Sequence, residues 1–147
     1  MNDPLVELPG YVLRRASGAA ASDLHRRLDA VDLRQADFAF MAVINRNPGI
    51  TQSEAGRILD IKRANMVAFA ARLEERKLLS RKRADGRSQA LTLTARGRAT
   101  LEKAHKIVLD FEADLVAGVP ESMRPMVLPV LTALWNGCKY RKKIPRA

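Results

Sequence analysis

Four basic side chains stand around one turn in the middle of the sequence. They are Arg81, Lys82, Arg83 and Arg87, and Ser88 follows them with a hydroxyl group. The turn itself is Asp85-Gly86, which predicts a β-hairpin, because glycine readily adopts positive φ and aspartate tolerates it. Guanidinium and ammonium groups bind phosphate oxygens through charge-assisted hydrogen bonds. The hairpin therefore carries groups that suit a polyanion.

Two further polar groups precede the hairpin. Thr51, Gln52 and Ser53 stand where a helix is expected to begin, and the amides and hydroxyls of a helix start can hold a phosphate. The other group is Lys62, Arg63, Ala64 and Asn65. An asparagine amide can make two hydrogen bonds to an adenine edge, and an arginine can contact a guanine or a phosphate. These pairings belong to nucleic-acid recognition.

The charge of the whole chain points to the same partner. Its 147 residues hold 26 Lys or Arg against 16 Asp or Glu, a formal net charge of +10. Residues 51–100 hold 12 basic and 5 acidic residues, which is +7 of that charge. Such an excess indicates a polyanion, with nucleic acid ahead of an anionic membrane surface.

No membrane or export signal accompanies this charge. The longest apolar run, residues 38–44, is too short to span a bilayer, and no basic start precedes an apolar stretch at the N-terminus. The single cysteine, Cys138, excludes an internal disulfide framework. We therefore expect a soluble, cytoplasmic protein without a membrane partner.

The elements that position the polar groups follow from hydrophobic spacing and helix caps. A first helix is predicted over residues 11–30, and Asp32 is expected to cap a second, which buries Phe38, Met41 and Val43-Ile44. Thr51 and Glu54 have capping-box spacing and start a third helix, which ends near residue 59. A fourth helix, about 62–77, follows a short link, so that the pair forms a helix-turn-helix. Gly56 is explained if the fourth helix approaches the third closely.

Two long helices are predicted after the hairpin. Thr94 is expected to cap the fifth helix, in which apolar residues recur every three or four positions at Leu101, Ala104, Val108, Phe111 and Leu115. A break at residues 118–120 separates it from a sixth helix, which is apolar on one face up to Cys138. These faces are too long for one small core to cover, and they predict a homodimer.

The predicted fold is mainly α-helical, with a small β-hairpin wing. It is a winged helix-turn-helix core, about residues 33–99, flanked by dimerisation helices at about 1–31 and 100–147 in a single domain. In this fold the second helix of the helix-turn-helix enters the major groove, and the wing lies over the neighbouring backbone or minor groove.

Residues 50–97 resemble the DNA-binding core of the MarR family of bacterial transcription regulators. "ITQSEAGRILDI" is similar to the family's third helix, "RANMVAFAARLEERKLLSRKR" to its recognition helix, and "DGRSQALTLTARG" keeps the spacing of its wing. Three residues depart from the pattern: Ala55 replaces a core leucine, Leu78 stands where a glycine usually ends the recognition helix, and Ala64-Asn65 replace a Ser/Thr pair. The resemblance implies that Arg87 enters the minor groove while Asp85 steadies it.

The resemblance also implies a ligand-released repressor that binds an inverted-repeat operator in double-stranded DNA as a homodimer. Members of the family commonly sense phenolic compounds, in a pocket between the first, second and fifth helices. The residues that could form it here are Arg14, Arg15, His25, Phe38, Met41 and Phe111. Their cationic and flat apolar groups suit an aromatic carboxylate or its coenzyme A thioester as effector.

Other readings of the sequence are weaker. An architectural DNA binder without an effector has the same charge pattern, and Cys138 could be a redox switch, although its place on an apolar helix face favours a buried filler. Without a G-x-S-x-G elbow, an H-E-x-x-H motif or a P-loop, no catalytic residue is assigned and an enzyme is not expected. His25 and His105 have no ligand partners at metal-site spacing, so neither a metal nor another cofactor is expected.

Overall fold

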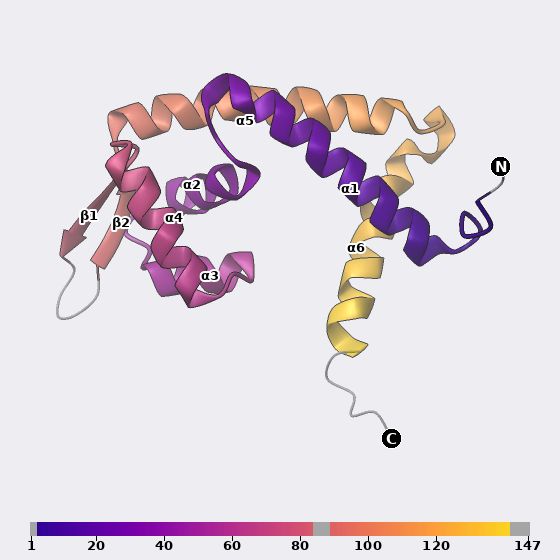
Figure 1. Ribbon diagram of the computed structural model, residues 1–147, viewed down its shortest axis with the longest axis horizontal. Coiled ribbons are helices and arrows are strands. Elements are labelled where there is room, and N and C mark those ends of the chain that lie inside the picture. The colour runs from indigo at the N-terminus through magenta and orange to yellow at the C-terminus, as the bar shows by residue number, and fades with distance from the viewer. Residues whose placement is uncertain (1–2, 84–88, 142–147) are drawn as a thin grey trace. The chain divides into compact units, whose positions relative to one another are not determined.

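The computed structural model describes residues 3–83 and 89–141, so the turn of the hairpin and both ends of the chain lie outside it. The chain forms two compact units, residues 1–109 and 110–147. The first unit contains α1 (Pro9–Leu28), η1 (Asp29–Val31), α2 (Gln35–Arg46), α3 (Gln52–Leu59), α4 (Arg63–Glu75), β1 (Leu79–Arg83), β2 (Gln89–Leu93) and the start of α5 (Ala95–Ala117) (Figure 1). The second contains the end of α5, then η2 (Glu121–Met123) and α6 (Arg124–Arg141). The predicted class, mainly helical with a hairpin wing, is confirmed.

Helix α3 begins as its sequence predicts. The Thr51 hydroxyl accepts a hydrogen bond from the Glu54 amide at 3.3 Å, and the Glu54 carboxylate accepts one from the Thr51 amide at 2.9 Å. At the other end, Asp60 adopts a left-handed conformation with φ +52°, which ends the helix. The chain then turns directly into α4, as a helix-turn-helix requires.

The prediction for the start of α2 is wrong. Asp32 lies before the helix with φ +53°, and Arg34 is the residue at the N-cap. Asp37, three residues further on, supplies the carboxylate and accepts a hydrogen bond from the Arg34 amide at 3.2 Å. On the buried face, Met41 and Ile44 are buried as predicted, but Phe38 is only half-buried and Phe40 is fully buried in its place.

The core of the first unit lies where α2, α3, α4 and the hairpin meet. Its largest fully buried apolar side chains are Leu28, Leu33, Phe40, Met41, Ile44, Met66, Leu73, Leu78 and Leu91. Gly56 lies against α4 as expected: a Cβ atom there would stand 3.0 Å from Met66 Cγ. Gly97 is packed more tightly still, because a Cβ atom there would stand 2.0 Å from the Leu78 carbonyl oxygen.

A segment before α3 pairs with the hairpin, which was not predicted. β1 and β2 are antiparallel, with Leu79 opposite Leu93 and Arg81 opposite Leu91. The segment just before α3 continues this sheet: the Gly49 amide donates to the Leu91 carbonyl at 3.0 Å, and the Leu91 amide donates to the Ile50 carbonyl at 2.9 Å. Backbone hydrogen bonds therefore join the wing to the start of the helix-turn-helix.

The residue that ends the recognition helix is not the one predicted. Lys77, with φ +56°, occupies the left-handed position after the helix, whereas Leu78 is a core residue that is 1% exposed. The Lys77 amide donates to the Glu74 carbonyl and the Leu78 amide to the Leu73 carbonyl, a common way of closing a helix. The position whose backbone favours glycine is therefore Lys77 and not Leu78.

The second unit exposes much of its apolar surface. Along α6, the exposed apolar side chains are Met126, Leu128, Val130, Leu131, Leu134 and Trp135. Cys138 is exposed too, so the prediction that this cysteine is buried does not hold within the single chain. In the parts of the chain that the structure describes, no helix is both long and apolar enough to cross a membrane.

Candidate nucleic-acid interface

The N-terminus of α3 presents polar groups around a closed cap. Thr51 uses its hydroxyl inside the capping box, as acceptor from the Glu54 amide and as donor to the Glu54 carboxylate at 2.7 Å. Hydrogen bonds from the Thr51 hydroxyl and amide hold the pKa of Glu54 below its ordinary value. Ser53 is exposed and Gln52 is half-buried beside it. Of the three predicted phosphate ligands, Thr51 is thus the one already engaged within the helix.

The first turn of α4 is presented to solvent. Lys62 is at the N-cap, and Ala64 and Asn65 are exposed in the turn that follows. The structure places the backbone of Arg63 in this turn but does not describe its side chain. This geometry suits a recognition helix, whose N-terminal residues contact base edges.

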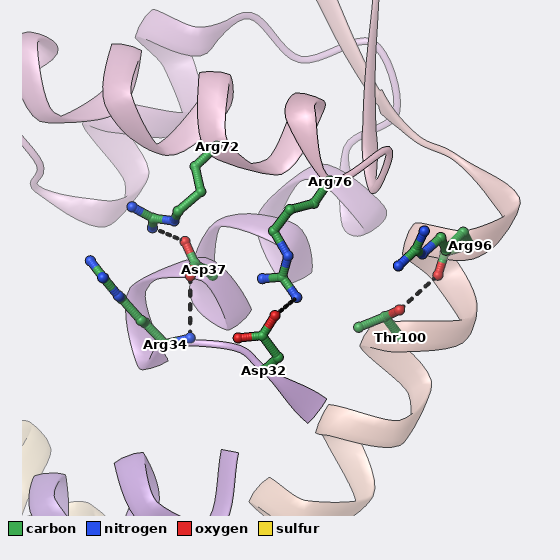
Figure 2. A network of polar contacts seen from close by, with 7 residues as sticks. All are labelled: Asp32, Arg34, Asp37, Arg72, Arg76, Arg96 and Thr100. Atoms are coloured by element: carbon green, nitrogen blue, oxygen red, sulfur yellow. Dashed lines mark hydrogen bonds and ion pairs between the residues drawn. The ribbon is translucent and has the colours of Figure 1, made fainter. Parts of the chain in front are cut away.

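Two ion pairs connect the inner side of α4 to the segment that begins α2 (Figure 2). The Arg72 guanidinium pairs with Asp37, whose side chain is 1% exposed, and lies 5.2 Å from the centre of the Phe69 ring. One turn later, Arg76 pairs with Asp32 at 2.8 Å, with the aspartate side chain 91% exposed. Neither pair was predicted from the sequence, although arginines one turn apart on a helix share a face.

The wing contributes one side chain that differs from its prediction. Arg81 lies on the same face of the hairpin as Leu79 and Leu91, where its Nε atom is 2.8 Å from a carboxylate oxygen of Glu74 in α4. It also donates to Gln89 at 3.3 Å, so it joins wing and helix instead of belonging to the tip. The period of two from Leu79 was the signal that could have shown this.

The remaining wing residues stay predictions of the sequence. The structure gives the backbone of Lys82 and Arg83 in β1 without their side chains, and Asp85, Arg87 and Ser88 lie outside the described residues. The exit of the wing is described and confirms the predicted cap: Thr94 accepts from the Gly97 amide at 2.9 Å and donates to the Lys77 carbonyl at 2.7 Å. That threonine therefore connects the ends of α4, β2 and α5.

The predicted effector residues fall into separate environments. On α1, Arg14 and Arg15 both lie against the Tyr11 ring, 5.2 and 5.8 Å from its centre. The Tyr11 hydroxyl accepts a hydrogen bond from Arg15 at 3.0 Å and donates one to Asp3 at 2.6 Å. Tyr11 was not predicted, and both arginines contact it.

The other predicted effector residues lie further along the chain. His25 is exposed, Met41 is fully buried in the core, and Phe111 is 5% exposed. Phe38 stacks on His105 of α5 with a centroid separation of 6.4 Å. A hollow of about 440 Å³ opens beside this pair between α2 and α5, lined by Ala42, Asn45, Arg46, Arg98, Leu101, Glu102 and His105. Within the described residues, no three His, Cys, Asp or Glu side chains gather as metal ligands would.

Known proteins are similar to this chain in fold and in sequence. A profile of the MarR family matches residues 31–88. The transcriptional repressor CouR bound to a 23-mer DNA duplex is 34% identical, with a TM-score of 0.84 over 91% of this chain and 99% of its own. CouR bound to p-coumaroyl-CoA is 36% identical, with a TM-score of 0.82 over 91% and 96%.

Curated sequences agree with the structures. A transcriptional repressor of Mycobacterium tuberculosis, Rv2887, is 27% identical over 110 residues, which are 74% of this chain and 79% of the repressor. Its structures in complex with p-aminosalicylic acid and with salicylic acid have TM-scores of 0.70 and 0.69. With CouR similar over nearly its whole length and the family profile covering the helix-turn-helix, the chain belongs to the MarR family of transcription regulators.

Proposed function

We propose that this MarR-family transcriptional repressor binds an inverted-repeat DNA operator as a homodimer, with α4 in the major groove and the wing beside it. The observation that carries the proposal is the exposed first turn of α4 in a chain similar to a repressor that has been solved on a DNA duplex. Two-fold symmetry would set the two recognition helices about one DNA turn apart, so that half-site centres are roughly 10 bp apart.

Exposed apolar side chains support the homodimer. Leu8, Val12 and Leu13 are exposed at the N-terminal end of α1, and α6 exposes a longer apolar row up to Trp135. Surfaces of this kind are rare on monomers and mark interfaces. A second copy of the same chain would bury the apolar residues of α1 and of α6 against the same apolar surfaces of its own.

Replacement of Arg87 by alanine is expected to weaken operator binding by about 1–3 kcal/mol, the range for one well-placed groove contact. Binding of the wild type should also weaken steeply with salt, with the slope of roughly 6–10 phosphate contacts. Both are measured by fluorescence anisotropy on a duplex selected from random sequences. Arg26→Ala is the matched control, because it removes an equal charge from an exposed position on α1 that pairs with Asp23. A flat salt response would contradict the proposal.

We further propose that an aromatic carboxylate or its coenzyme A thioester is the releasing ligand. Two similar repressors have been solved with p-coumaroyl-CoA and with salicylic acid. On this chain, Arg14 and Arg15 are held side by side at the Tyr11 ring, where their guanidinium groups could take a carboxylate or a phosphate. To lower operator occupancy a hundredfold, the ligand must prefer the released state by about 2.7 kcal/mol.

The expected result is that such a compound raises the melting temperature and weakens operator binding, and that Arg15→Ala abolishes this response while sparing DNA affinity. A thermal-shift screen of aromatic acids and their coenzyme A esters, followed by anisotropy, measures both effects. Arg26→Ala on the same helix should respond as the wild type does. If no compound acts and oxidation of Cys138 releases the DNA, the redox alternative replaces the ligand. If neither acts, the protein is an architectural binder.

A further inference from the structure

The outward side of α4 carries methyl groups where charge would be expected on a DNA-binding helix. Ala64, Ala68 and Ala71 recur at a spacing of four and three residues, which places them on one face, and all three are exposed. Val67 and Asn65 are exposed on opposite flanks of that face, Val67 with 53% of its surface open. Val67 therefore presents more than half of its branched apolar surface to solvent, in the first half of the helix.

The cations at the other end of the helix are directed away from this face. Arg72 and Arg76 point toward the start of α2, where Asp37 and Asp32 pair with them (Figure 2). Glu74, near the end of the helix, pairs with Arg81 of the wing. Among the described side chains of the outward face, the groups that could meet a base over the first half of α4 are therefore methyl groups and one amide.

The major groove offers a matching group at one base alone. Thymine presents a C5-methyl group there, whereas adenine, guanine and cytosine present no methyl group. We propose that Val67 reads the C5-methyl group of a thymine in each half-site of the operator. The inference rests on the proposed function, because it requires α4 to lie in the major groove. It deepens that function by making Val67 a residue that determines base specificity.

The three alanines on the same face of α4 would allow this contact. Short side chains let the helix backbone approach the floor of the groove, so that the Val67 isopropyl group can reach a methyl group that projects only slightly from the base. One buried methyl group contributes about 0.8 kcal/mol, which corresponds to about a fourfold change in affinity. The half-site should therefore contain an A·T pair that is read by apolar contact and not by hydrogen bonds.

The test removes the methyl group from the DNA instead of from the protein. A duplex selected from random sequences by the full-length protein is resynthesised with deoxyuridine in place of thymidine at one position at a time. At one thymine per half-site, this change should weaken binding of the wild type about fourfold. The same change should have no effect on binding by Val67→Ala, because the contact is already lost. Ile58→Ala is the matched control, since Ile58 is similarly exposed, at 59% against 53%, but belongs to α3. It should keep the full uridine response.

The outcomes separate the two proposals. If no duplex is selected, the proposed function fails. If a duplex is selected but no uridine position affects the wild type, the function stands and the inference is overturned. An undiminished uridine response in Val67→Ala would also overturn it, because another residue would then read the methyl group. Circular dichroism of each variant confirms that the fold is retained.

Discussion

Replacement of Asp37 by asparagine should lower the free energy of unfolding by about 2–3 kcal/mol. Asp37 is 1% exposed and holds two partners, the Arg72 guanidinium and the Arg34 amide. The asparagine keeps the shape of the side chain and can still accept a hydrogen bond from the Arg34 amide, but it leaves Arg72 without its counter-ion. Removing one partner of a fully buried pair costs about 3–5 kcal/mol. We expect a cost of about 2–3 kcal/mol here, at or below the lower end of that range. The reason is that the Arg72 side chain is 28% exposed and can reach water.

The chain contains its own control for this experiment. Asp32→Asn removes the same charge from the neighbouring pair with Arg76, but Asp32 is 91% exposed, so the cost should stay below about 1 kcal/mol. Asparagine also tolerates the left-handed conformation that Asp32 adopts. Urea denaturation of both variants at one protein concentration measures the difference. Equal costs for the two variants would show that burial of Asp37 does not matter.

Replacement of Gly97 by alanine should cost about 3 kcal/mol or more. The new Cβ atom would stand 2.0 Å from the carbonyl oxygen of Leu78 and 2.9 Å from its carbonyl carbon. Both are backbone atoms of a buried residue, which cannot rotate away as the end of a side chain can. Forcing extra atoms into packed cores costs 1–3 kcal/mol and occasionally more, and a clash with backbone belongs to the upper end.

Thermal unfolding followed by circular dichroism measures this loss. Gly118→Ala adds the same methyl group where the nearest heavy atom, the Leu115 carbonyl oxygen, is 3.6 Å away. It should change the stability by no more than about 0.5 kcal/mol, as substitutions in open positions do. A melting temperature of Gly97→Ala within error of the wild type would contradict the tight contact between α5 and Leu78, which follows α4.

Local signals predicted the parts of the fold that depend on neighbours in sequence. The spacing of Thr51 and Glu54 gave the start of α3, Thr94 gave the cap of α5, and Gly56 gave the approach of α4. In each case the residues that make the contact are a few positions apart, or the contact needs only that a side chain be absent. Such features can be inferred before the chain is folded.

Contacts between distant segments could not be predicted in the same way. Asp37 and Arg72 are 35 residues apart, and nothing near either residue states that they meet. Asp32 and Asp37 are of the same residue type, and only the path of the chain through η1 decides which carboxylate accepts from the backbone at the start of α2. Arg81 has the residue type of a phosphate ligand, yet Glu74 of α4 lies within reach and pairs with it. The side chains at the wing tip stay predictions.

The hydrogen bonds between residues 49–50 and Leu91 have a mechanical consequence. They close the link between helix-turn-helix and wing into a loop of backbone, which Arg81 and Glu74 brace on the side of α4. The recognition helix and the wing therefore form one stiff body, or lever, in which the distance between them is fixed. A signal that releases DNA has little scope to change that distance. In the proposed dimer, such a signal would meet less resistance by swinging each lever as a body, which would alter the gap between the two levers.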